Sequence, residues 1–236
     1  IVAAMARDSL FEYSTLEERT GHAIGFQDCG VLTIAGPRTP EMVERVRATK
    51  MAVLRWDEAA VGLRARVEFV RRECDADDWP DWSDRALLAT LDEWLAPYLG
   101  AMTGRADIER LDIAIVLAAQ LGWDRSQRLA VLAPPRLATP SGREVAIDYG
   151  SDNATASVRV QDLFGVDRHP CVADGRVPIV LELLSPADRP LQVTSDLPGF
   201  WAGSWAEVRK EMAGRYPKHH WPADPSKAVP KRLKDR

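Results

Sequence analysis

Hydrophobic residues in the last third of the chain first alternate and then recur at helical spacing. A predicted strand carries Val177, Ile179, Leu181 and Leu183 on one face, and Val180 and Leu184 make its other face apolar too. This pattern is typical of a strand that is covered on both sides. Residues 185–190 are rich in turn formers, and the alternation of Leu191 and Val193 predicts a hairpin partner.

Beyond that hairpin the apolar spacing becomes helical. Asp196 is suited to cap a helix, and Pro198 is tolerated in its first turn. The residues that recur every three or four positions are Leu197, Trp201, Trp205, Val208 and Met212. We therefore expect one helix over residues 197–216, with an apolar stripe that packs on the small sheet.

The preceding hundred residues show helical spacing. Thr39 begins a short helix with an apolar stripe of Met42, Val43 and Val46. A second helix begins near Asp57, and a third carries Leu87, Leu91, Trp94 and Leu95. The run 111–121 is apolar nearly all round, which predicts a buried central helix ending near Gly122. A last short helix is expected from Asp124 toward Leu132.

Hydrophobic and polar residues alternate in two further regions, which predicts β structure there. Residues 1–36 contain four short alternating segments separated by turn residues. Prolines 134, 135 and 140 mark the best internal boundary, after which Val145, Ile147 and Tyr149 predict a strand that turns back into residues 156–160. The predicted fold is α+β: a β-rich region (1–36), a helical region (37–133) and a mixed domain (134–236) with a small antiparallel or mixed sheet covered by a helix.

Composition narrows the possible functions. The chain has 236 residues and a formal net charge of −4, so any attraction to a polyanion must come from local patches. It contains no GxxxxGK[ST] phosphate loop and no DEAH box, and its serines and histidines form no recognisable catalytic set. Three distant cysteines and the adjacent His219 and His220 give no metal-site spacing, so we expect no metal site and no catalytic residue. Without a bilayer-length apolar run or a signal-like start, the chain is expected to be cytoplasmic and free of membrane contact.

The C-terminal end is basic and aromatic, which makes it the candidate nucleic-acid-binding site. Cations neutralise phosphates, and exposed aromatic rings stack on unpaired bases. Packing of Tyr216 and Trp221 on the domain, with solvated charges around them, is an equal alternative. The candidate residues are Arg209, Lys210, Arg215, Tyr216, Lys218, His219, Trp221, Lys227, Lys231, Arg232 and Lys234.

Several long runs also resemble the C-terminal region of HrpB-type bacterial DEAH-box ATP-dependent helicases. They are PSGREVAIDYG, VRVQDLFG, GRVPIVLELLSPADRPLQVTSDL, FWAGSW and VRKEMAGRYPKHHWPADP. The resemblance implies that residues 1–36 belong to an OB-like module and that the complete protein couples ATP hydrolysis, with Mg, to movement on RNA. It further implies that this region is non-catalytic, needs no cofactor of its own, and has two partners: RNA or single-stranded nucleic acid, and the upstream motor domains of the same chain.

Two other interpretations of the function remain open from the sequence alone. A structural or protein-docking domain without nucleic-acid contact would expose Trp79, Trp82 and Trp123 on an apolar surface. A free-standing enzyme would need catalytic groups brought together only in space. Arginines 64, 66, 71 and 72 lie among acids on the second predicted helix, so a salt-bridged solvated face is expected there rather than a phosphate site.

Overall fold

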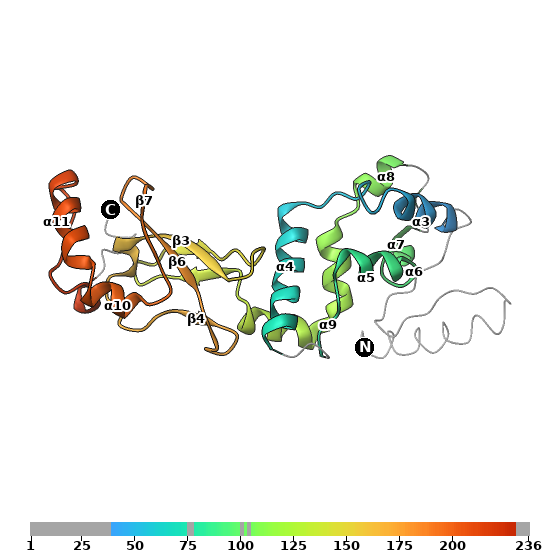
Figure 1. The fold of residues 1–236 in the computed structure, drawn as a ribbon. Coiled ribbons are helices and arrows are strands. Elements are labelled where there is room, and N and C mark those ends of the chain that lie inside the picture. The colour runs from blue at the N-terminus through green and yellow to red at the C-terminus, as the bar shows by residue number, and fades with distance from the viewer. Residues whose placement is uncertain (1–38, 75–77, 100–101, 103–104, 230–236) are drawn as a thin grey trace, which may run out of the picture. The chain divides into compact units, whose positions relative to one another are not determined.

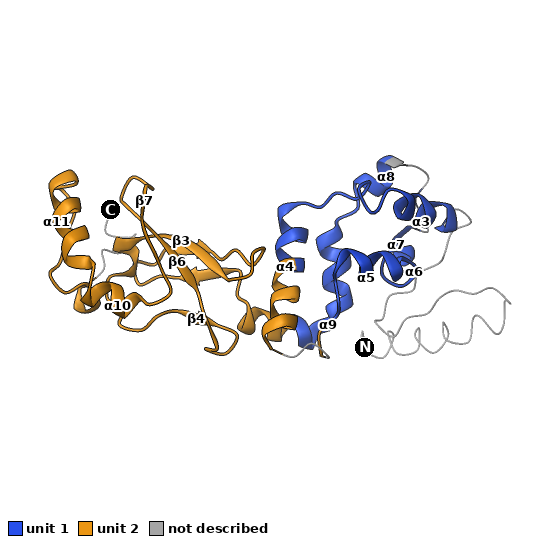
Figure 2. Cartoon of the chain, in the orientation of Figure 1, with its two compact units in different colours: residues 1–64, 80–126 blue, residues 65–79, 127–236 orange. Residues whose placement is uncertain are grey.

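A computed structural model describes residues 39–74, 78–99, 102 and 105–229 (Figure 1). The β segments expected within residues 1–36 lie outside this range. The chain divides into two compact units (Figure 2): unit 1 comprises Ile1–Arg64 and Pro80–Ser126, and unit 2 comprises Ala65–Trp79 and Gln127–Arg236. Two long helices, α4 and α9, each contribute one part to either unit. The α+β class expected from the sequence is confirmed.

The described part of unit 1 is helical. Its elements are α3 (Thr39–Ala48), the start of α4 (Glu58–Glu73), α5 (Asp84–Ala89), α6 (Leu91–Trp94), α7 (Ala96–Leu99), α8 (Arg105–Glu109) and the start of α9 (Ile113–Leu132). Met42, Val43 and Val46 bury one face of α3 as their spacing predicts. The expected third helix is instead broken at Thr90 (φ −108°, ψ 22°), where α5 ends and α6 begins.

The apolar run before Gly122 was expected to be buried on all sides, and this expectation was wrong for one face. Val116, Leu117 and Leu121 are buried, but Ile115 is 64% exposed. Gly122 has φ 69° and ψ 176°, so the helical path is interrupted close to the predicted end. Such a positive φ is easily adopted by glycine, and the second half of α9 then continues to Leu132.

Unit 2 is built around a three-stranded sheet in the order β3–β6–β7. Strand β3 (Thr155–Arg159) pairs in parallel with β6 (Val180–Leu184), and β6 pairs antiparallel with β7 (Pro190–Thr194), as the hairpin pattern predicts. Two small antiparallel pairs flank it: β1 (Arg136–Ala138) with β2 (Glu144–Ala146), and β4 (Cys171–Val172) with β5 (Val177–Pro178). The described part of the unit also contains the 3-10 turns η2 (Val160–Leu163) and η3 (Pro225–Lys227).

Two expectations for these strands need correction. The predicted hairpin between residues 145–149 and 156–160 is reduced to one bridge, Asp148 with Thr155, because β2 pairs with β1 and β3 with β6. Strand β6 is fully covered on one face only. Leu181 and Leu183 are buried, whereas Val180 and Leu184 are partly exposed and Glu182 is exposed.

The expected single helix over residues 197–216 is two helices, α10 (Leu197–Ala202) and α11 (Trp205–Arg215). They are separated at Gly203, whose φ of −102° and ψ of −98° are not helical. The predicted cap is confirmed, because the Asp196 carboxylate accepts a hydrogen bond of 2.9 Å from the Gly199 amide. The apolar stripe also holds, with Leu197, Trp205 and Met212 buried.

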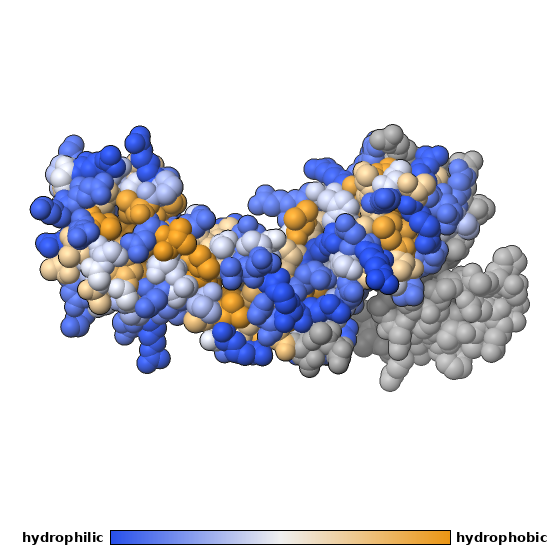
Figure 3. Space-filling view, viewed as in Figure 1, coloured by the Kyte–Doolittle hydropathy of each residue, from blue (hydrophilic) through white to orange (hydrophobic). Residues whose placement is uncertain are grey.

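Hydrophilic residues dominate the visible surface and leave only small apolar patches between them (Figure 3). Among the described helices, none combines the length and the apolar character needed to cross a bilayer.

Candidate nucleic-acid interface

An aromatic cluster centred on Trp205 holds the C-terminal segment together. The ring of Trp205 lies 5.4 Å from that of Trp201, 5.7 Å from Phe164, 6.1 Å from Phe200 and 6.2 Å from Trp221, measured between centroids. Its indole N–H donates to the Pro222 carbonyl over 3.0 Å. Tilted and edge-to-face aromatic pairs of this kind add to the free energy of burial. The helical spacing missed Phe164 and Phe200, because neither lies on the stripe of α10 and α11.

Trp221 belongs to this core rather than to the surface. It is 8% exposed, and its indole N–H donates to the Tyr216 carbonyl over 3.0 Å. The Arg209 Nε donates to the Trp221 carbonyl over 2.9 Å and so ties the loop 216–221 to α11. The sequence leaves two roles open for Trp221, packing on the domain or stacking on a base. The structure favours packing, since the ring would have to leave the aromatic cluster to stack on a base.

The exposed aromatic surface of the loop comes from its other residues. Tyr216 is partly exposed and His219 is exposed. Their rings meet edge to face with centroids 6.1 Å apart, and the His219 amide donates to the Tyr216 carbonyl over 3.1 Å. The two rings therefore contact each other at the surface of the loop.

Cations on α11 and its following loop differ in their partners. Arg215 lies 3.8 Å from Glu211, and Lys227 lies 3.4 Å from Asp224. Exposed pairs of this kind are weak, so a phosphate can compete for either cation. Lys210 and Lys218 are exposed and form no ion pair with a described residue. The predicted contacts Lys231, Arg232 and Lys234 lie outside the described range.

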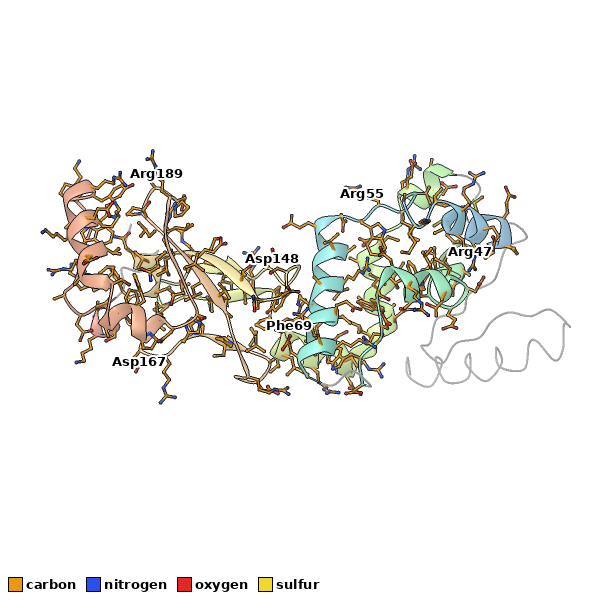
Figure 4. All side chains as sticks on the ribbon, viewed as in Figure 1. Arg47, Arg55, Phe69, Asp148, Asp167 and Arg189 are labelled. Atoms are coloured by element: carbon orange, nitrogen blue, oxygen red, sulfur yellow. The ribbon has the colours of Figure 1, made fainter. Side chains whose placement is uncertain are left out.

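An acidic hollow limits how far such an interface extends. It measures about 360 Å³ and is lined by Asp167, Trp201 and Asp224 among others; Figure 4 labels Asp167. The hydrogen bond from Ser226, and then the contact with Lys227, hold the pKa of Asp224 below its usual range. Because a carboxylate repels phosphate, this hollow does not favour contact with a phosphate backbone.

The arginines of α4 are mostly structural. Arg64 pairs with Asp84 at 2.8 Å and donates to the Trp82 carbonyl at 2.6 Å, and Arg72 pairs with Glu73 at 2.7 Å. The expectation of ion pairing is wrong for Arg66, which donates instead to the carbonyls of Ala133 (2.6 Å) and Leu129 (3.4 Å). Arg66 thereby satisfies carbonyls at the C-terminal end of α9, and its burial lowers the pKa of its guanidinium.

Buried tryptophans account for the aromatic loop near residue 80. Trp79 and Trp82 are 4% and 1% exposed, so the docking surface expected under the alternative interpretation does not include them. Trp123, by contrast, is 76% exposed. In the described part of the chain, no three His, Cys, Asp or Glu side chains gather closely enough to hold a metal ion.

Comparison with known proteins identifies the relatives of this chain. A family model described as ATP-dependent helicase C-terminal (HrpB_C) matches residues 94–225. The ATP-dependent RNA helicase HrpB of Escherichia coli (strain K12) is 44% identical over 192 residues, which are 81% of this chain and 24% of that protein.

Solved structures agree with this relationship. The crystal structure of the E. coli DExH-box NTPase HrpB superposes with a TM-score of 0.80 at 40% identity, over 86% of this chain and 26% of that one. A crystal structure of the E. coli DEAH/RHA helicase HrpB gives a TM-score of 0.69 at 39% identity, over 78% of this chain and 24% of that one. The chain thus spans about a quarter of the length of the relatives that it matches.

Proposed function

This chain belongs to the HrpB-type ATP-dependent helicase C-terminal family, and we propose that it is a non-catalytic accessory region that holds single-stranded nucleic acid for an RNA helicase. In this proposal ATP and Mg bind to upstream motor domains of the complete protein, because the sequence has no phosphate loop. RNA and those motor domains are the two partners.

The observation that carries the nucleic-acid role is the anchored basic loop. Trp221 and Arg209 fix residues 216–221 against α11. Lys210, Lys218 and His219 are consequently exposed on a framework that is already ordered. A preorganised basic and aromatic surface binds phosphates and bases with less ordering cost than a flexible tail does.

A second candidate function is a structural domain that steadies the motor without touching RNA. The exposure of Ile115 (64%) and Trp123 (76%) favours it, because large apolar side chains at the surface are typical of protein contacts. Both functions are compatible with the family, and only binding measurements separate them.

Fluorescence anisotropy with a labelled single-stranded RNA of about 12 nucleotides tests the proposal. The 236-residue chain is titrated at about 0.05 M and about 0.2 M salt, beside a variant with Lys210→Gln, Arg215→Gln and Lys218→Gln. We expect wild-type binding that weakens with salt and at least about a fivefold loss in the variant.

A matched control removes three exposed cations elsewhere: Arg85→Gln, Arg110→Gln and Arg136→Gln. Equal losses in the two variants would mean a general charge effect and would sink the assignment to the loop. Absence of RNA binding by the wild type would favour the structural role. ATP hydrolysis by this chain at a motor-like rate would contradict the division of labour.

A further inference from the structure

A second basic segment lies in unit 1, far in sequence from the C-terminal loop. Residues 45–55, RVRATKMAVLR, contain four cations and no acid. The sequence signal is this absence of acids among closely spaced cations. Figure 4 labels two of the four cations, Arg47 on α3 and Arg55 just before α4.

The backbone of this segment is a tight and anchored turn. The Lys50 amide donates to the Arg47 carbonyl (3.0 Å), and the Met51 amide donates to the Val46 carbonyl (2.9 Å). Lys50 and Met51 have φ of 48° and 65°, which reverse the chain directly after α3. Val46, Met51 and Leu54 are buried. The turn is therefore held by buried side chains, and its cations project from an ordered backbone.

Three of the four cations are available for a ligand. Arg47 is engaged by Glu44 (3.1 Å) and Asp92 (3.0 Å). Arg45, Lys50 and Arg55 are exposed, and their side chains form no hydrogen bond or ion pair with a described residue. Three unpaired positive charges within eleven residues repel one another, and a bound polyanion relieves that repulsion.

A hollow beside the turn indicates which polyanion fits. It measures about 310 Å³ and is lined by the cation Arg45, the hydroxyl-bearing Thr49 and the apolar Ala52 and Val53. A phosphate can bind the cation, and the face of a ribose or a base can pack on the apolar side chains. A single strand of nucleic acid supplies both groups in every nucleotide.

From these contacts we infer that residues 45–55 form a second binding site for single-stranded nucleic acid, in which Arg45, Lys50 and Arg55 contact backbone phosphates. The inference rests on the proposed function, because it assumes that this chain binds nucleic acid. It assigns to unit 1 a contact that is separate from the loop 216–221.

The experiment compares the wild-type 236-residue chain with a variant carrying Arg45→Gln, Lys50→Gln and Arg55→Gln. The control is again Arg85→Gln with Arg110→Gln and Arg136→Gln, which removes the same charge from exposed side chains. Binding of single-stranded RNA is measured by anisotropy over a series of salt concentrations. We expect at least about a tenfold loss at about 0.1 M salt, and a salt slope shallower by about 2 for three lost phosphate contacts. Equal thermal unfolding midpoints establish that both variants are folded.

The outcomes separate the inference from the proposed function. An unchanged affinity and slope in the 45–55 variant, with wild-type binding intact, would overturn the inference alone. Equal losses in this variant and the control would overturn it too, since they would reflect net charge. If the wild type fails to bind RNA, the proposed function falls, and the inference falls with it.

Discussion

The two basic segments, 45–55 and 209–227, differ in how they use their cations. In 209–227 three of the five lysines and arginines have partners: Arg209 bonds to a carbonyl, while Arg215 and Lys227 face acids. In 45–55 only Arg47 has a partner among the residues that the structure describes. Segment 209–227, whose basic and aromatic residues predict nucleic-acid binding, thus has the smaller share of unpaired cations.

The aromatic residues explain this difference. Trp205 and Trp221 draw the C-terminal segment onto the core of unit 2, and Arg209 follows because the Trp221 carbonyl needs a donor. Segment 45–55 is anchored by apolar residues that need no polar partner, and Arg45, Lys50 and Arg55 stay at the surface. A basic and aromatic pattern therefore predicts a folded segment as readily as a binding surface.

The largest expected effect comes from Trp221→Ala. Truncation of this ring removes its contact with Trp205 and the hydrogen bond to Tyr216. We expect the free energy of unfolding of unit 2 to fall by about 3 kcal/mol, measured by urea denaturation with circular dichroism. His220→Ala, at an exposed site, serves as the control and should stay within about 0.5 kcal/mol of wild type. Unchanged stability with lost RNA affinity would instead make Trp221 a stacking residue.

A smaller effect is expected from Arg209→Gln, set against its neighbour Lys210→Gln. Loss of the bond from Arg209 leaves the Trp221 carbonyl without this donor, which costs about 1 kcal/mol of unfolding free energy. Lys210 is exposed and forms no ion pair with a described residue, so its substitution should leave stability unchanged and weaken RNA binding. The reverse pattern, with Lys210 stabilising and Arg209 binding, would contradict the distinction between packed and available cations.

Local patterns in the sequence predicted local structure well. The Asp196 cap, the buried face of α3 and the β6–β7 hairpin all depend on residues within a few positions of one another. The parallel pairing of β3 with β6 joins Thr155 to Val180, and no nearby residue encodes it. The break at Gly203 was missed because the apolar stripe continues across it.

The same limit applies to the candidate site. The sequence shows that cations are dense near the C-terminus. Whether a cation is free to bind phosphate depends on contacts that form only in the fold. Arg66 shows this on α4, where a backbone carbonyl far along the chain replaces the expected acid. Arg45, Lys50 and Arg55 have no aromatic residue beside them within segment 45–55, so the basic and aromatic pattern does not mark them.

The smallest expected effect concerns the pair formed by Lys227 and Asp224. The Ser226 hydroxyl and amide donate to the Asp224 carboxylate over 2.6 Å and 3.1 Å, and Lys227 lies farther away at 3.4 Å. These contacts lower the pKa of Asp224 in the folded state, so they stabilise the fold above the unfolded pKa of about 3.9. That stabilisation is lost as the pH falls through the folded-state pKa.

A carboxyl titration followed by NMR checks the order of these causes. Ser226→Ala should raise the pKa of Asp224 more than Lys227→Gln does, because the hydrogen bond from Ser226 is the larger cause. The stability difference between wild type and Asp224→Asn should also shrink as the pH is lowered, since protonation and the substitution both remove the negative charge of the Asp224 side chain. A larger rise in Lys227→Gln would mean that Lys227 is held firmly by Asp224. It would then be less available to phosphate, and the contrast with the unpaired cations of segment 45–55 would sharpen.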